Sequence, residues 1–223
     1  MNISDLLKDP NKVKELLEDA LEDKNKKLAE MLVPIVKDPW LTYRYAHEIV
    51  KGKIKDEWED IIARNSQSAI YYAMEILHKP FPKGEDVISQ NPDHAAMYAR
   101  SVLHKPWPKG EDAIAQGDSA SYLYAYNVLH GPFPKGEDAI AQYYYTSYLY
   151  AKNVLKGPFP KGEDAIAKDP ESSYLYAKDV LKDRFIKGED AIINSDWLEP
   201  YVEFLKSINK LDEFLKDHPE VKI

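Results

Sequence analysis

The chain has 223 residues, with 38 acidic and 30 basic side chains, a formal net charge of -8 and no cysteine. This balance argues against a general nucleic-acid or anionic-membrane binder, which would carry a basic excess, and the lack of cysteine excludes disulfides, thiolate metal sites and cysteine nucleophiles. No apolar run approaches the ~18 residues of a membrane span. Residues 1–5 lack the basic and apolar segments of a signal peptide, so we expect a cytoplasmic protein.

Residues 1–31 predict a degenerate first repeat and an N-terminal capping helix. Residues 6–10 resemble residues 166–170, which lie in a well-formed repeat. Further along, apolar residues such as Val13 and Leu17 recur among many charged ones. That spacing is typical of an amphipathic helix with one wet face.

Residues 32–188 are predicted to form the core of the protein from repeats of 26 residues. The string Lys-Gly-Glu-Asp begins at Lys83, Lys109, Lys135, Lys161 and Lys187, at equal spacing. Each repeat predicts a stiff loop around one aromatic residue, a short helix that begins with Glu-Asp, and a longer helix. Trp58 is interpreted as a one-residue insertion. An isoleucine recurs in the short helix, and we expect it in the core: Ile35, Ile62, Ile88, Ile114, Ile140, Ile166 and Ile192.

Residues 189–223 predict a degenerate last repeat and a C-terminal capping helix over residues 200–216. One repeat is too thin to bury its apolar residues on both sides, whereas stacked neighbours can do so. The sequence therefore predicts an all-α protein, an α-solenoid of about seven helix pairs with caps at both ends, in one continuous domain.

The repeat resembles a short two-helix repeat of uncharacterised viral and bacterial proteins, bacteriophage ones in particular. The resemblance rests on the PFPKGEDAIA…DP…YLYA…VLK pattern and covers roughly residues 32–192. It implies no catalytic residue. A phage origin would imply a partner in a host defence or regulatory system, and a location in the host cytoplasm.

Tyrosine provides the candidate binding residues. Residues 143–145 are three tyrosines where the neighbouring repeats have small or capping residues such as Asp169. Tyrosine is favoured at binding hot spots, so this triplet predicts a protein-binding patch; local packing is the alternative. The further candidates are Trp40 and Trp197, in the same column as Tyr145, and a second column that we expect to be half exposed, with Tyr122, Tyr148 and Tyr174.

Histidine and carboxylate columns have structural interpretations. His78, His104 and His130 share a column with Lys156 and Lys182, which suits the negative end of a helix dipole better than a metal site. The Glu-Asp pairs suit helix starts, and adjacent helical carboxylates do not face each other. We expect no catalytic, cofactor or metal site and no enzymatic activity.

The leading functional hypothesis is a scaffold that binds another protein through its repeat surface. One alternative is a binder of a small, nucleotide-like ligand between tyrosine-lined repeats, and another is an acidic nucleic-acid mimic. Direct nucleic-acid binding and membrane binding are not expected, and a homo-oligomer is left open.

Overall fold

The computed structural model describes residues 9–222, and within that span all regular structure is helical, with no strand. The sequence-based expectation for residues 1–5, and most of that for residues 6–10, lies outside the described residues. The chain divides after Ala113 into two compact parts, which we call the N-terminal half and the C-terminal half. The expectation of one continuous domain stays a prediction.

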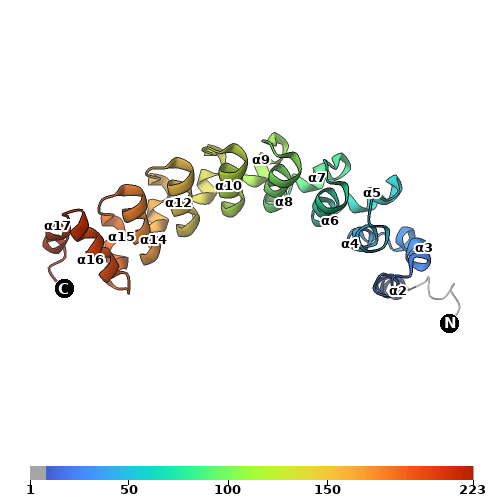
Figure 1. Ribbon diagram of the computed structural model, residues 1–223, viewed down its shortest axis with the longest axis horizontal. Helices are drawn as coiled ribbons and strands as arrows, with labels where there is room; N and C mark the ends of the chain where they lie inside the picture. Colours follow the sequence, from blue (N-terminus) through green and yellow to red (C-terminus); the bar gives the residue numbers. More distant parts are fainter. Residues whose placement is uncertain (1–8, 223) are drawn as a thin grey trace. The chain divides into compact units, whose positions relative to one another are not determined.

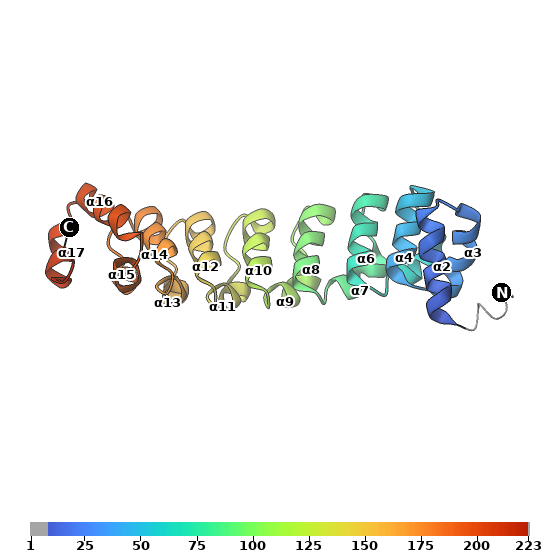
Figure 2. The same ribbon diagram turned by 90° about the horizontal axis from the view of Figure 1, so that it is seen from below.

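The N-terminal half contains three consecutive long helices, each extended by a π-helical segment. In Figures 1 and 2 the helices α4, α6 and α8 lie side by side, and α6 contacts both of the others. The elements in chain order are α2 (Pro10–Glu22), α3 (Lys26–Val36), α4 (Pro39–Arg44) with η1 (Tyr45–Val50), α5 (Asp56–Ile62), α6 (Ser66–Tyr71) with η2 (Tyr72–Leu77), η3 (Pro82–Gly84), α7 (Glu85–Ile88), α8 (Pro92–Tyr98) with η4 (Ala99–Leu103), and α9 (Pro108–Ile114), in which the division falls.

The C-terminal half repeats this arrangement. Helix α12 lies between α10 and α14 and contacts both, and Figure 2 shows the short helices α11 and α13 at one end of the long ones. The elements are α10 (Asp118–Tyr124) with η5 (Ala125–Leu129), η6 (Pro134–Gly136), α11 (Glu137–Ile140), α12 (Tyr144–Tyr150) with η7 (Ala151–Leu155), η8 (Pro160–Gly162), α13 (Glu163–Ile166), α14 (Pro170–Tyr176) with η9 (Ala177–Leu181), α15 (Ile186–Ile193), α16 (Leu198–Ser207) and α17 (Leu211–Asp217).

A buried tyrosine ties the repeat together in several of the long helices. The ring of Tyr150 is fully buried, its hydroxyl donates to Glu137 Oε1 at 3.1 Å, and the same hydroxyl accepts from the Phe133 N–H at 2.9 Å. The ring also meets the next loop aromatic, Phe159, edge-on at 5.1 Å between centroids. The hydroxyl therefore joins loop, short helix and long helix. The same bonding is found at Tyr72, Tyr98, Tyr176 and Tyr201.

Lysine and aspartate of the Lys-Gly-Glu-Asp strings connect successive repeats. Lys161 Nζ lies 2.7 Å from Asp138 Oδ1 of the string before it. The N-terminal half has the equivalent pair between Lys109 and Asp86, also at 2.7 Å. Each lysine thus reaches one repeat back along the chain. These pairs are exposed to solvent, so each contributes little to stability.

Aspartate and asparagine side chains cap several of the helices, and one predicted core position is wrong. The side chains of Asp9, Asp38, Asn91 and Asp169 all accept from backbone N–H groups of the helices that follow them. The isoleucine column is fully buried from Ile62 to Ile192. Ile35, by contrast, is 49% exposed. It belongs to the longer helix α3, which contains Pro34, and not to a separate short helix as in the later repeats. Trp58 is a buried ring packed edge-on against Tyr45 and is more than an insertion.

Each long helix ends in a turn that is unfavourable for the residue that occupies it. The N–H groups of His104 and Lys105 both donate to the carbonyl of the buried Ala99, which forces His104 into the left-handed region at φ 52°. A left-handed non-glycine residue costs about 1–2 kcal/mol, whereas a cation at a helix C-terminus gains about 0.3–1 kcal/mol. The dipole therefore does not fully offset the backbone cost. The same conformation is found at Lys51, His78, His130, Lys156 and Lys182.

Replacing His104 with glycine is accordingly expected to raise the free energy of unfolding by about 0.5–1 kcal/mol. Glycine adopts the left-handed conformation without the Cβ clash. Urea denaturation followed by circular dichroism measures the change. Lys105→Gly, one residue further on and outside the left-handed region, is the matched control and should give no gain. Equal stabilisation by both variants would contradict the argument.

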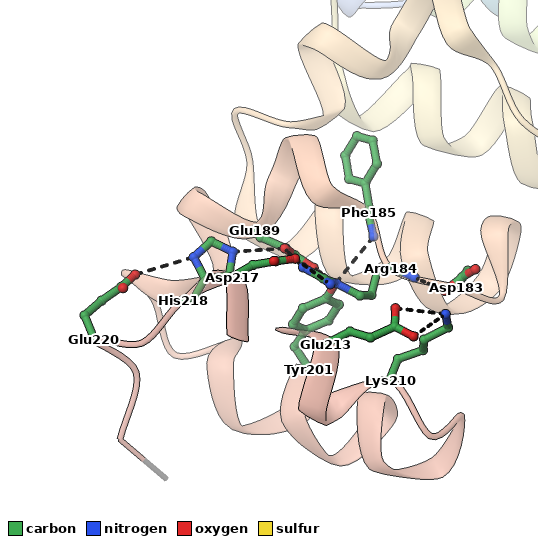
Figure 3. Close-up of polar contacts among 10 residues, drawn as sticks. All are labelled: Asp183, Arg184, Phe185, Glu189, Tyr201, Lys210, Glu213, Asp217, His218 and Glu220. Carbon is green, nitrogen blue, oxygen red and sulfur yellow. Dashed lines mark hydrogen bonds and ion pairs between the residues drawn. The ribbon is translucent and has the colours of Figure 1, made fainter. Parts of the chain in front are cut away.

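A buried ion-pair cluster closes the C-terminal end, where the repeat pattern ends (Figure 3). The Arg184 guanidinium donates to both carboxylate oxygens of the fully buried Glu189, at 2.8 and 2.7 Å, and pairs with Asp217 at 2.8 Å. Tyr201 donates its hydroxyl proton to the same glutamate at 2.7 Å, and His218 Nε2 lies 3.0 Å from it. The cluster joins α15, α16 and α17. The region predicted as one capping helix over residues 200–216 therefore contains two helices, α16 and α17, which ion pairs and hydrogen bonds connect to α15.

Candidate binding surface

The tyrosine triplet lies at the start of α12, and all three rings are exposed. Tyr143, Tyr144 and Tyr145 are 57%, 47% and 56% exposed. Tyr143 holds the N-cap position with an extended backbone, and its side chain makes no capping hydrogen bond. In the next repeat Asp169 caps α14 by accepting from the Ser172 N–H at 2.8 Å. The triplet thus puts half-exposed aromatic rings where the next repeat has a capping residue, and its side chain at the N-cap position does not satisfy the backbone N–H groups of the helix.

Two tyrosines of α10 and η5 extend this surface. The rings of Tyr122 and Tyr126 stack at 5.9 Å between centroids, and Tyr126 is 48% exposed. Burial raises the pKa of the Tyr122 hydroxyl, and Tyr126 and Tyr145 add to that rise. Helix α10, which carries Tyr122, contacts α12, which carries Tyr145. We call Tyr122, Tyr126 and residues 143–145 the tyrosine patch.

Tyr126 was not among the sequence candidates, although a signal was available. Its equivalents in other repeats are His47, Arg100, Lys152 and Lys178, all exposed, and Met74, which is half-buried. A column that accepts charged residues in several repeats faces solvent, so its one tyrosine adds an exposed ring. This comparison along the column would have identified Tyr126.

A groove opens beside the patch, between the ends of η5 and η7. It has a volume of about 350 Å³ and is lined by Tyr126, His130, Gly131, Pro132, Asn153, Val154 and Lys156. The Asn153 amide donates to the Tyr122 hydroxyl at 3.0 Å. The amide therefore fixes one wall of the groove to the tyrosine patch.

Two of the sequence candidates are buried, so the expectation that they are half exposed was wrong. Tyr148 is 3% and Tyr174 is 7% exposed. The Tyr148 hydroxyl donates to Asp179 at 2.7 Å and accepts from Lys152 at 2.8 Å. The next repeat thus covers the ring and binds its polar end, so neither tyrosine presents a free face. Tyr122 of the same column is intermediate in exposure, as expected.

The two tryptophan candidates lie in different halves and different surroundings. Trp40 is 41% exposed on α4 in the N-terminal half, where its ring contacts Tyr43 at 5.1 Å and Tyr71 at 6.2 Å. Trp197, in the C-terminal half, is partly buried and stacks on Tyr174 at 5.3 Å. Trp197 packs at the C-terminal end, whereas Trp40 offers an exposed face of its own.

The histidine column lies at the ends of long helices, and the glutamates of the carboxylate column accept hydrogen bonds from tyrosines. In residues 9–222 no group of three or more histidine, aspartate or glutamate side chains is arranged to hold a metal ion. The glutamates of the Lys-Gly-Glu-Asp strings accept from buried tyrosines, as Glu163 does from Tyr176 at 3.1 Å. Sequence reasoning placed these acids at helix starts, which is correct, and missed the tyrosine hydroxyl 13 residues further along.

In comparisons with known proteins, no family model, curated protein or solved structure matched the chain. Within the part of the chain that the structure describes, no helix combines the length and the apolar character needed to cross a membrane.

Proposed function

We propose that this chain is a non-enzymatic helical-repeat protein that binds another protein through the tyrosine patch. We further propose that its repeats continue through both halves as an α-solenoid. The observation that carries the binding proposal is the exposure of Tyr143, Tyr144 and Tyr145 at a position where other repeats place a capping residue.

The chemistry of the patch supports a protein partner. Tyrosine provides a large, rigid contact area with only two side-chain torsions to immobilise, and its hydroxyl adds hydrogen bonds at the rim. The backbone beneath is held by packed helices, so little conformational entropy is lost on binding. The mechanism would be steric occlusion of the partner. A host defence or regulatory protein as that partner stays a prediction.

The groove beside the patch supports a second candidate, a small-molecule ligand. Its volume of about 350 Å³ is at the lower end of ligand sites, which range from about 300 to 1,000 Å³. Tyr126 would stack on a planar ring and Asn153 would offer its amide oxygen. Isothermal titration with nucleotides separates this candidate from the first. The acidic mimic has no comparable observation in its favour.

The test replaces Tyr143, Tyr144 and Tyr145 with serine and measures capture of partner proteins from the native host. If each ring contributes about 2 kcal/mol, as hot-spot residues do, the loss of three rings lowers the affinity by more than about 1,000-fold. Ile186→Ser is the matched control, because Ile186 is also exposed in the C-terminal half but lies outside the patch. Unchanged capture by the triple variant would refute the proposal, provided that both variants melt like the wild type.

A further inference from the structure

A row of lysines and histidines without carboxylate partners follows the C-terminal ends of the long helices in the described part of the N-terminal half. Lys51, His78, Lys79, His104 and Lys105 are all exposed at the ends of η1, η2 and η4. Successive members of this row are neighbours, since η2 contacts both η1 and η4. We call these five residues the basic ridge.

The ridge lysines differ from other lysines of the same repeats. Lys83 and Lys109, in the Lys-Gly-Glu-Asp strings, each pair with an aspartate at 2.7 Å. Lys79 and Lys105 pair with no carboxylate among residues 9–222. Arg100 adds another exposed cation beside the ridge. The nearest acids in sequence are Glu48 and Glu75, each three residues from a ridge member. Glu48 pairs with Arg44 at 2.7 Å and with Lys24 at 2.8 Å. Glu75 accepts from Tyr43 and lies 3.7 Å from His47. The ridge therefore carries positive charge that the protein itself does not neutralise.

A groove between neighbouring helices accompanies the ridge. It has a volume of about 230 Å³ and is lined by Ala73, Met74, His78, Lys79, Ser101, Val102 and His104. The groove beside the tyrosine patch is its equivalent in the C-terminal half, with His130 and Lys156 in the places of His78 and His104. The repeat thus builds the same cation-walled groove in both halves.

The backbone gives independent support for a role in binding. His78 and His104 occupy left-handed positions at φ 48° and 52°, which glycine would occupy with less strain. Attraction to the helix dipole does not fully offset that strain. Strained residues that persist in a fold are frequent at ligand-binding positions.

We propose that the basic ridge binds an extended acidic segment of a partner protein. Packed helices lie ~8–10 Å apart, and an extended chain advances ~3.3 Å per residue, so an acid at every third residue would meet one helix end after another. Met74 and Val102 in the groove would contact the side chains between the acids. A nucleic acid fits less well, because the ridge has no tryptophan, tyrosine or phenylalanine on which a base could stack and the chain carries a net charge of -8.

The experiment measures binding of a fluorescein-labelled peptide of repeated Glu-Ala-Ser triplets by fluorescence anisotropy. The variant Lys79→Ser with Lys105→Ser should weaken binding by about tenfold or more, in line with the loss of two charge-assisted contacts. The matched control, Lys83→Ser with Lys109→Ser, removes the same charge away from the ridge and should weaken binding less than about twofold. Equal losses in the two variants, or no binding by the wild type, would overturn the proposal.

Two further measurements distinguish the ridge from simpler explanations. The variant His78→Gly with His104→Gly should bind the peptide more weakly while it unfolds at a higher urea concentration; unchanged binding would mean that these residues are only helix ends. A single-stranded uridine oligonucleotide of the same length should bind more weakly than the peptide. Tighter binding of the oligonucleotide would overturn the choice of an acidic protein segment.

Discussion

Replacing Arg184 with alanine is expected to lower the free energy of unfolding of the C-terminal half by about 3–5 kcal/mol, because it leaves a buried carboxylate without its cation. Glu189 is fully buried, and Arg184 supplies two of the hydrogen bonds that it accepts. The guanidinium also pairs with Asp217 and lies over the Phe214 ring at 5.8 Å. The loss should release α17 first, and hydrogen exchange of the amides of residues 211–217 measures that release.

A control in the same end of the molecule separates burial from charge. Lys210 pairs with Glu213 at 2.9 Å, but this pair is at the surface. Lys210→Ala removes one positive charge as well and should leave the urea midpoint almost unchanged. Similar losses in the two variants would show that net charge, and not the buried pair, stabilises this end.

The lowered pKa of Glu189 makes the stability of this end of the molecule depend on pH. Burial on its own would raise the pKa of this carboxyl, but hydrogen bonds from Arg184, Tyr201 and His218 lower it below its usual value. A carboxyl with a lowered pKa in the folded state contributes stability above its unfolded pKa, near 4.3–4.5, and loses that contribution as the pH falls through its folded pKa. In Arg184→Ala this acid-sensitive part of the stability should shrink.

The repeat period was sufficient to predict most of one buried column of residues, because equivalent residues of successive repeats have equivalent surroundings. It placed the isoleucine column in the core, and from Ile62 onward this column is buried; the loop aromatics from Phe81 to Phe185 are buried as well. It failed at Ile35, where the first repeat differs in structure. Period alone describes an average repeat, so it is least informative where one repeat departs from the others.

Contacts between columns were harder to predict than the columns themselves. The exposure of residues 143–145 followed from the loss of a cap, which is a local rule. The burial of Tyr148 depends on Asp179, 31 residues away in the next repeat. The left-handed turn at His104 depends on the π-helical widening of the chain before it. The repeat pattern of a single sequence does not show which side chains of neighbouring repeats come into contact, or that a long helix ends in a left-handed turn.

Gly162→Ala is expected to destabilise the C-terminal half by about 2–3 kcal/mol, because the core has no room for one more methyl group. A Cβ at Gly162 would lie 2.5 Å from Phe159 Cδ1 and 2.7 Å from Ser147 Cβ. Both neighbours are buried, and Ser147 is further fixed by its hydrogen bond to the Ile140 carbonyl at 2.9 Å. The loop aromatic can therefore approach the long helix only if glycine stands between them. Thermal unfolding measures the loss of stability in the Gly162→Ala variant.

Gly157→Ala, the same chemical change in the same loop, should have the opposite sign. A Cβ at Gly157 would meet nothing closer than 3.9 Å, and the residue is not in the left-handed region. Alanine there restricts the unfolded chain and should stabilise the fold by about 0.4–1 kcal/mol. Adding Phe159→Leu to Gly162→Ala should restore part of the lost stability, since the smaller side chain vacates the space that the methyl group needs. Destabilisation by both alanines, without rescue by leucine, would mean that flexibility of the loop, and not contact with Phe159, requires these glycines.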